Sequence, residues 1–224
     1  MTTETKTRRA RREPLSRERV VETAIRLADE GGIESLSMRK LADQLGVVPM
    51  ATYYHFANKD DLLDAMVDAM YAEIDLPTEG ADWKAAMRRQ TSSVRAVLAR
   101  HRWALGVMES RIQPGPANLR YHDTVIGALR HAGFSVAMAI HVFTLLDSYV
   151  FGFALQEQTL PFESTDRVGD VASAILSQVP ADDYPNLAET VVEHVGKPGY
   201  DFGDEFEFGL GVILDGLERF REAA

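Results

Sequence analysis

A short stretch near the N-terminus carries side chains suited to lying against DNA. Residues 47–57 contain no Asp or Glu, and the outer face of a helix there would present Met50, Ala51, Thr52, Tyr53 and His55. A surface without carboxylates can approach the phosphate backbone, and an α-helix fits the major groove in size. These residue types therefore indicate a helix that reads DNA.

Two short helices joined by a tight turn would position these side chains. The second helix starts near Val48, with Pro49 in its first turn, where the missing N–H costs nothing. Gly46 precedes it and can take the left-handed conformation that ends a helix. The first helix has apolar residues at the spacing of one helical face, at Met38, Leu41, Ala42 and Leu45. This is a helix-turn-helix pattern.

Side-chain pairs that would support catalysis are few. His122 with Asp123, and His141 with Asp147, are the candidate His–Asp pairs, and neither lies beside an obvious nucleophile. The chain has no Cys, no Gly-rich phosphate loop and no His spacing typical of a metal site. We therefore expect no enzyme, no metal and no cofactor. An all-α enzyme is the alternative, which turnover of a ligand would support.

The charge is unevenly distributed along the 224 residues. The net charge is −10, but residues 1–60 hold 11 Lys and Arg against 9 Asp and Glu, whereas the other 164 hold 13 against 25. A mildly basic head on an acidic body suits a protein that docks one end on DNA. Residues 1–14 include five basic side chains, and we expect a disordered arm that is either a solvated tail or a DNA-contacting segment.

The rest of the chain shows helical spacing and no strand alternation, so the expected fold class is all-α. A first helix runs from an N-cap at Ser16 to about Glu30, and a fourth runs from Lys59 to about Ile74. After a linker over 75–82, we expect helices near Trp83–Arg100, Trp103–Ser110, Ala117–Ala132, Ser135–Thr159, Arg167–Gln178, Leu187–Val195 and Asp204–Ala223. Ser135–Leu155 is long enough to suggest a membrane span, but it contains His141 and Asp147, which favour a buried helix.

Residues 16–75 resemble the N-terminal DNA-binding domain of the tetracycline-repressor (TetR) family of bacterial transcription regulators. The resemblance lies in GIESLSMRKLADQLGV, in the short helix ending TYYHF and in NKDDLLDAM. The C-terminal part is similar, more loosely, to the regulatory domain of that family, in HRWAL, GFSVAMAIHVFTLLDSYVFGFALQEQ and DEFEFGLGVILDGLE. The resemblance implies a three-helix helix-turn-helix DNA-binding domain with its connecting helix over 15–75, and a larger helical ligand-binding and dimerisation domain over 76–224.

The same resemblance implies which residues meet a double-stranded DNA operator: Ser37, Arg39, Pro49, Met50, Ala51, Thr52, Tyr53, Tyr54 and Lys59. The chemistry agrees, because an arginine can donate two hydrogen bonds to guanine, and Met and Ala side chains suit thymine methyl groups. The hydroxyl and lysine side chains suit phosphate and sugar, which set register. For Tyr54 and His55 the alternative is a core role that holds the helix.

The resemblance also implies a homodimer that reads a palindrome with two helices about one DNA turn apart, roughly 34–36 Å. The dimer surface would come from Ser135–Leu155 and Asp204–Phe220, with Gly152, Gly209 and Gly216 allowing close approach. The alternative is that these two segments are simply the core of one chain.

A small-molecule effector inside the C-terminal domain is a further implication of the resemblance. The expected lining is Trp103, Met108, Arg111, His122, Met138, His141, Phe151 and Gln156, which suits a largely apolar molecule oriented by a few hydrogen bonds. Met108 stands where the tetracycline repressor has a magnesium-binding His. A thioether is a poor ligand for a hard cation, so we expect no tetracycline–magnesium complex.

The expected function is therefore that of a cytoplasmic, ligand-responsive regulator, most simply a repressor. The fourth helix would be the lever that couples ligand to DNA, because it joins both domains. The alternative is a dimeric DNA-binding regulator that answers to a protein partner.

Overall fold

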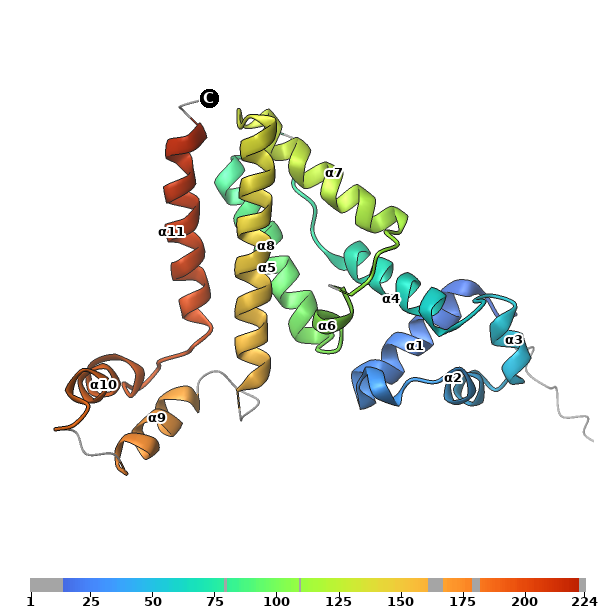
Figure 1. The fold of residues 1–224 in the computed structure, drawn as a ribbon, viewed down its shortest axis with the longest axis horizontal. Coiled ribbons are helices and arrows are strands. Elements are labelled where there is room, and N and C mark those ends of the chain that lie inside the picture. Colours follow the sequence, from blue (N-terminus) through green and yellow to red (C-terminus); the bar gives the residue numbers. More distant parts are fainter. Residues whose placement is uncertain (1–13, 79, 109, 161–166, 179–181, 222–224) are drawn as a thin grey trace, which may run out of the picture. The chain divides into compact units, whose positions relative to one another are not determined.

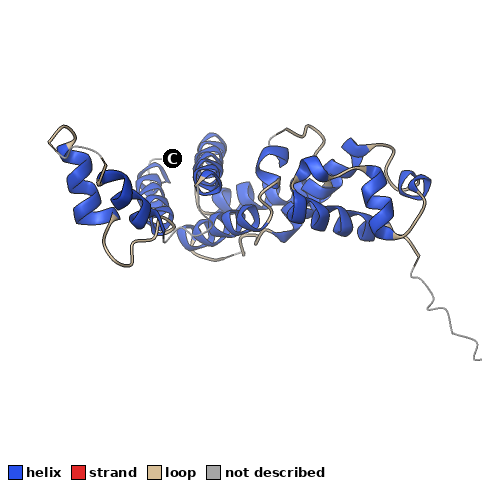
Figure 2. Ribbon diagram, turned by 90° about the horizontal axis from the view of Figure 1, so that it is seen from below, coloured by secondary structure: helices blue, strands red, loops and turns tan. Residues whose placement is uncertain are grey.

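The computed structural model describes residues 14–78, 80–108, 110–160, 167–178 and 182–221, and over these ranges it contains helices and no strand (Figure 2). The expected all-α fold class is thus confirmed. The chain divides into two compact units after Met66. Most of the expected basic arm, residues 1–13, lies outside the described residues.

The first unit contains α1 (Arg17–Gly31), a 3₁₀ turn η1 (Ile33–Ser35), α2 (Met38–Leu45), α3 (Pro49–Tyr53) and the start of α4 (Lys59–Glu73). Its helix ends follow from local chemistry. The hydroxyls of Ser16 and Ser37 accept the N–H groups of residues three positions later, as N-caps do. Gly46 ends α2 with φ at 67°, in the left-handed region where a side chain would be strained. The expected turn is therefore present.

The second unit contains α5 (Trp83–Arg100), α6 (Ala104–Met108), α7 (Pro116–His131), α8 (Val136–Thr159), α9 (Val168–Leu176), α10 (Pro185–Thr190), the π-helical turn η3 (Val191–Val195) and α11 (Asp204–Arg221). The order agrees with the expected one, and most ends agree within two residues. The expected helix near Trp103–Ser110 is shorter, because α6 starts only after the turn in which the His101 carbonyl accepts the Ala104 N–H.

Helix α8 is the centre of the second unit and packs against α5, α7 and α11. It runs antiparallel to α11 (Figure 1), since Tyr149 donates to the Phe206 carbonyl (2.9 Å) and Arg221 donates to the Ala132 carbonyl (3.4 Å). A Cβ on Gly209 would lie 2.3 Å from the Tyr149 hydroxyl oxygen, so this glycine allows the close approach of α11 to α8 within one chain.

Within the described ranges, α8 is also the one helix whose length and apolar composition would suit a membrane span. One of its faces is buried against the rest of the second unit, through Ala139, Val142, Leu146 and Val150. This face of α8 therefore belongs to the core of the second unit, while other residues of the helix, including His141, are exposed in the single chain.

Candidate functional site

The first unit presents an exposed face on α2 and α3. Ser37, Arg39, Pro49, Met50, Tyr53 and Tyr54 are exposed, and Ala51 and Lys59 are half-buried. The exposed fraction is 65% for Met50 and 85% for Tyr54. Met, Tyr and Arg side chains are suited to base edges, sugars and phosphates. Eight of the nine residues expected to meet DNA therefore lie where DNA can reach them.

Thr52 is the exception and requires a correction. Its side chain is fully buried, and its hydroxyl donates to the Pro49 carbonyl at 2.8 Å. A phosphate ligand must be exposed, so the geometry assigns Thr52 to holding α3 together and not to direct DNA contact. Tyr54 differs from Thr52, because its side chain is exposed. This exposure excludes the alternative that Tyr54 is a core residue holding the helix.

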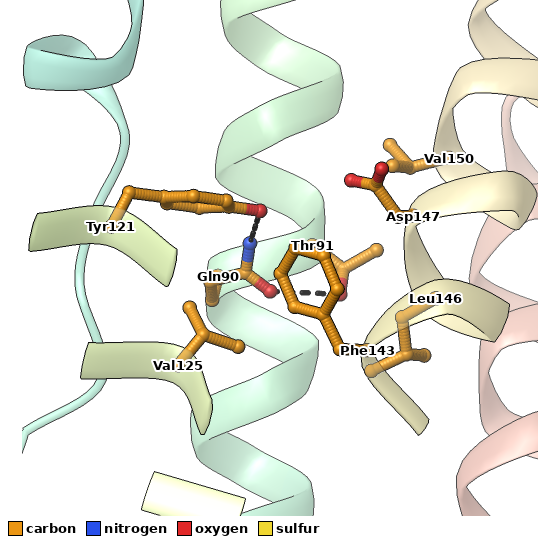
Figure 3. A pocket seen from close by; sticks show the side chains of 8 residues that line it. All are labelled: Gln90, Thr91, Tyr121, Val125, Phe143, Leu146, Asp147 and Val150. Carbon is orange, nitrogen blue, oxygen red and sulfur yellow. Dashed lines mark hydrogen bonds between the residues drawn. The ribbon is translucent and has the colours of Figure 1, made fainter. Parts of the chain in front are cut away.

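The second unit holds a polar cluster between α5, α7 and α8 (Figure 3). The Gln90 side-chain amide donates to the Tyr121 hydroxyl oxygen at 2.7 Å, and the Thr91 hydroxyl donates to Oε1 of the Gln90 side chain at 3.3 Å. Asp147 of α8 lies on the far side beside Val150, and Val125, Phe143 and Leu146 complete the lining. The cavity between them is about 10 Å³. This conformation is therefore closed to any molecule larger than water.

Burial dominates the electrostatics of this cluster. It raises the pKa of the Tyr121 phenol far above its usual range, and the negative charge of Asp147 raises it further, while the hydrogen bond from Gln90 opposes the shift. Tyr121 is thus a neutral phenol at any physiological pH, able both to accept from Gln90 and to donate to a further acceptor.

A larger outer pocket of about 310 Å³ lies beside the end of α4 and the start of α7. Its lining is Val67, Tyr71, Met108, Arg111, Ile112, Gln113, Pro114, Gly115, Asn118 and His122. The His122 ring centroid lies 5.2 Å from that of Tyr121 and 5.1 Å from that of Phe143, both of which line the inner cavity. These aromatic rings therefore form the wall between the outer pocket and the polar cluster.

The structure brings together three of the expected ligand residues, Met108, Arg111 and His122, in the outer pocket. The other five line neither pocket. Trp103 is buried beside His101, Met138 and Phe151 are half-buried on α8, and His141 and Gln156 are exposed on the same helix. Across the described ranges, no three His, Asp or Glu side chains gather as a metal site requires.

Sequence reasoning overlooked Gln90, Thr91 and Tyr121, and it considered Asp147 only as a partner of His141 and as a residue that disfavours a membrane span. A signal existed for the first two, because they fall on the buried stripe of α5, between Met87 and Val94, where the other buried residues are apolar. A polar residue at such a position must find a hydrogen-bond partner, and that requirement marks an internal polar site.

Two anchors fix the second half of α4 within its own unit. The Asp68 carboxylate accepts the backbone N–H of Asn118 at 2.9 Å, in the first turn of α7. The Glu73 carboxylate pairs with Arg100 and lies 3.4 Å from Nε2 of His101, at the end of α5. The outer pocket lies between these anchors, since Val67, Tyr71 and Gly115 line it.

Comparisons with known proteins find matches for both the N-terminal and the C-terminal part of the chain. Residues 20–66 match the family model "Bacterial regulatory proteins, tetR family", and residues 76–221 match "Tetracyclin repressor-like, C-terminal domain". The chain is 34% identical over 214 residues to the HTH-type transcriptional repressor DrrR1 of Streptomyces coeruleorubidus, covering 91% of this chain and 77% of that protein.

Two further matches come from other bacteria. The tetracycline repressor protein class A from transposon 1721 of Escherichia coli is 32% identical over 205 residues, covering 90% of each chain. The crystal structure of the Streptomyces coelicolor TetR family protein ActR in complex with actinorhodin matches with a TM-score of 0.77 and 28% identity, covering 92% of this chain and 98% of the other. The chain therefore belongs to the TetR family of bacterial transcription regulators, which bind DNA and are not enzymes.

Proposed function

We propose that this chain represses transcription from a palindromic operator as a homodimer, and that a small, largely apolar molecule with a few polar groups releases it. The proposal extends the functions of its relatives, one a repressor and one crystallised with actinorhodin, to this chain. We place its action in the cytoplasm, and assign 15–75 to DNA binding and 76–224 to ligand binding and dimerisation.

The observation that carries the effector role is the buried Gln90–Tyr121 pair. Burying an amide and a phenol in an apolar core costs their desolvation, and the hydrogen bond between them offsets only part of that cost. The pair therefore stabilises the fold less than aliphatic side chains in the same place would. The pair also retains unused capacity: the phenol can still donate, and the Gln90 amide has a second N–H. A hydroxyl- or carbonyl-bearing ligand that displaces the His122 and Phe143 rings of the wall could use both groups.

Homodimerisation is typical of the family, and exposed apolar side chains support it for this chain. Seven large apolar side chains on α8 and α11 are exposed in the single chain: Val136, Ile140, Leu145, Leu155, Phe208, Val212 and Phe220. Nothing within 4 Å would meet a Cβ on Gly152 or Gly216, so both positions are open for a second copy to approach. We propose that these two helices and their mates form a four-helix bundle.

Helix α4 is the proposed lever between ligand and DNA. A molecule in the outer pocket would contact Val67 and Tyr71 on α4, and it would act on the Asp68 and Glu73 anchors beside them. A coupling on the order of 1–3 kcal/mol gives roughly 5–150-fold weaker DNA binding.

The closed inner cavity favours a second candidate, in which a protein partner and not a small molecule controls the regulator. At about 10 Å³ that cavity admits no ligand in this conformation, whereas the outer pocket, at about 310 Å³, is open. Under this candidate, the polar cluster would be a structural feature that never opens.

One experiment tests both candidates. A palindromic duplex selected by the wild-type protein is bound in the presence and absence of planar, hydroxyl-bearing aromatic compounds, beginning with actinorhodin. We expect Arg39→Ala to lose operator binding, and Gln90→Leu to bind DNA normally but resist release. Failure of every compound to release the wild type would favour the protein partner, and absence of any preferred duplex would contradict the operator itself.

A further inference from the structure

The DNA-reading helix α3 contains few contacts within itself that could fix its orientation. Helix α3 is five residues long, its N-cap residue Val48 makes no side-chain hydrogen bond, and its one buried side chain is Thr52. A helix this short gains no stability by itself and takes its direction from what holds its ends. The contacts of the turn that follows Tyr53 therefore help to set the direction of α3.

Arg17 provides such contacts from the far end of the first unit's sequence. Its Nη1 donates to the His55 carbonyl oxygen at 2.6 Å, and its guanidinium lies 4.0 Å from the centroid of the Phe56 ring. Phe56 is buried, and the N–H groups of both His55 and Phe56 bond to the Thr52 carbonyl at 3.1 Å. Arg17 thus contacts the turn that follows α3 through both residues, by a hydrogen bond to His55 and by packing on Phe56.

Arg17 itself lies at the start of a helix that is packed into the core. Arg17 is the first residue of α1, directly after the N-cap Ser16, and α1 buries Val20, Val21, Ala24 and Leu27 in the core of the unit. The contact therefore ties the start of α1 to the turn that follows α3. A planar guanidinium suits both tasks, because it donates in its plane and stacks on an aromatic face, whereas an ammonium group does not stack flat.

We propose that Arg17 is a positioning residue for sequence discrimination: it sets the orientation of α3, and so favours the operator over other DNA, without itself contacting DNA. The inference rests on the proposed role of α3 as the DNA-reading helix. Because the Arg17 side chain is exposed, the competing role is that of a simple phosphate ligand, and the two roles predict different results.

The test measures binding of the full-length protein to the operator that the wild type selects and to a scrambled duplex, over a series of salt concentrations. The variants are Arg17→Gln and Arg17→Lys, with Arg26→Gln, an exposed arginine on the same helix, as the matched control. We expect both Arg17 variants to bind the operator at least about tenfold more weakly, since a tilted helix weakens several base contacts at once. Binding to the scrambled duplex and the salt dependence should match those of the wild type and of Arg26→Gln.

A phosphate ligand would give the opposite pattern and would overturn the inference. Arg17→Gln would then weaken binding to both duplexes alike, the slope of log K against log salt would fall by about 0.9 for each lost contact, and Arg17→Lys would restore binding. Thermal unfolding shows whether each variant is folded at the assay temperature, and Arg17→Lys, the milder change, decides the question if Arg17→Gln unfolds. Wild-type behaviour of both variants would overturn this inference alone, whereas a wild type with no preferred duplex would overturn the proposed function as well.

Discussion

Thr52 and Tyr53 are neighbours on α3 with opposite surroundings, and this contrast gives a prediction at the scale of single residues. Thr52→Val keeps the side-chain volume but removes the hydrogen bond to the Pro49 carbonyl, so we expect a loss of about 0.5–1.5 kcal/mol in the free energy of unfolding. Operator affinity should change less than about twofold. Tyr53→Phe is the matched variant, and it should weaken operator binding and leave chemical denaturation unchanged. A large loss of affinity in Thr52→Val would restore that residue as a DNA contact.

The Tyr121 phenol gives a pH-dependent prediction. Its pKa is raised by burial, so above about pH 10 the unfolded chain loses this proton while the folded chain retains it. Stability is therefore fully present below pH 10 and falls as the pH rises beyond it, by up to about 1.4 kcal/mol per pH unit from this residue. We expect urea unfolding at pH 8 and pH 11 to show a smaller alkaline loss in Tyr121→Phe than in the wild type.

The neutral-pH result for the same variant has a separate cause. Tyr121→Phe leaves the buried Gln90 amide without its acceptor, so its stability at pH 8 should already be lower by about 1–3 kcal/mol. Tyr53→Phe, at an exposed site, is the control and should follow the wild type at both pH values. An alkaline loss that is identical in Tyr121→Phe and the wild type would show that the phenol opens to solvent.

Helices α4 and α7 depend on each other, which gives a prediction at the scale of elements. The N-cap residue of α7, Gly115, has no side chain, and Asp68 of α4 caps that helix in its place. Asp68→Ala should therefore lower the free energy of unfolding by about 0.5–2 kcal/mol, the usual cost of losing an N-cap. It should also reduce the extent to which a releasing ligand weakens DNA binding.

Two glycine variants on α7 provide the matched comparison. A Cβ on Gly115 would lie 2.3 Å from the Asp68 carboxyl carbon, so Gly115→Ala should displace the carboxylate and resemble Asp68→Ala. A Cβ on Gly127 meets nothing within 4 Å, so Gly127→Ala should be neutral or stabilising by up to about 1 kcal/mol. Wild-type ligand response in both Asp68→Ala and Gly115→Ala would remove this contact from the coupling mechanism.

At the scale of the whole molecule, the prediction concerns assembly. Val212 and Phe208 are exposed on α11, by 59% and 72%. If α8 and α11 form the dimer bundle, Val212→Asp places a charge in an apolar interface and should yield monomers in sedimentation equilibrium, with operator binding lost because two half-sites are no longer read together. Leu119→Asp, at a comparably exposed position on α7, is the control. A Val212→Asp protein that is still dimeric would show that the dimer interface does not include this part of α11.

The sequence by itself determined the helices and the DNA-reading face, because the signals for them are local. Caps at Ser16, Ser37 and Asn58 bond to N–H groups three residues away, and Gly46 ends α2 through its own φ angle. Apolar spacing adds which face of each longer helix is buried. These features predicted a helix-turn-helix, and the resemblance of residues 16–75 to the TetR family added the class of regulator.

Only the tertiary structure showed which polar residues are buried and which contacts hold the DNA-reading helix α3. Thr52 could not be placed from its sequence, because a five-residue helix has too few turns for periodicity to show its buried side. The partner of Gln90 is 31 residues away, and the partner of Arg17 is 38 residues away. Such pairs are set by how separate helices pack, and the spacing of residues along one helix carries no information about them.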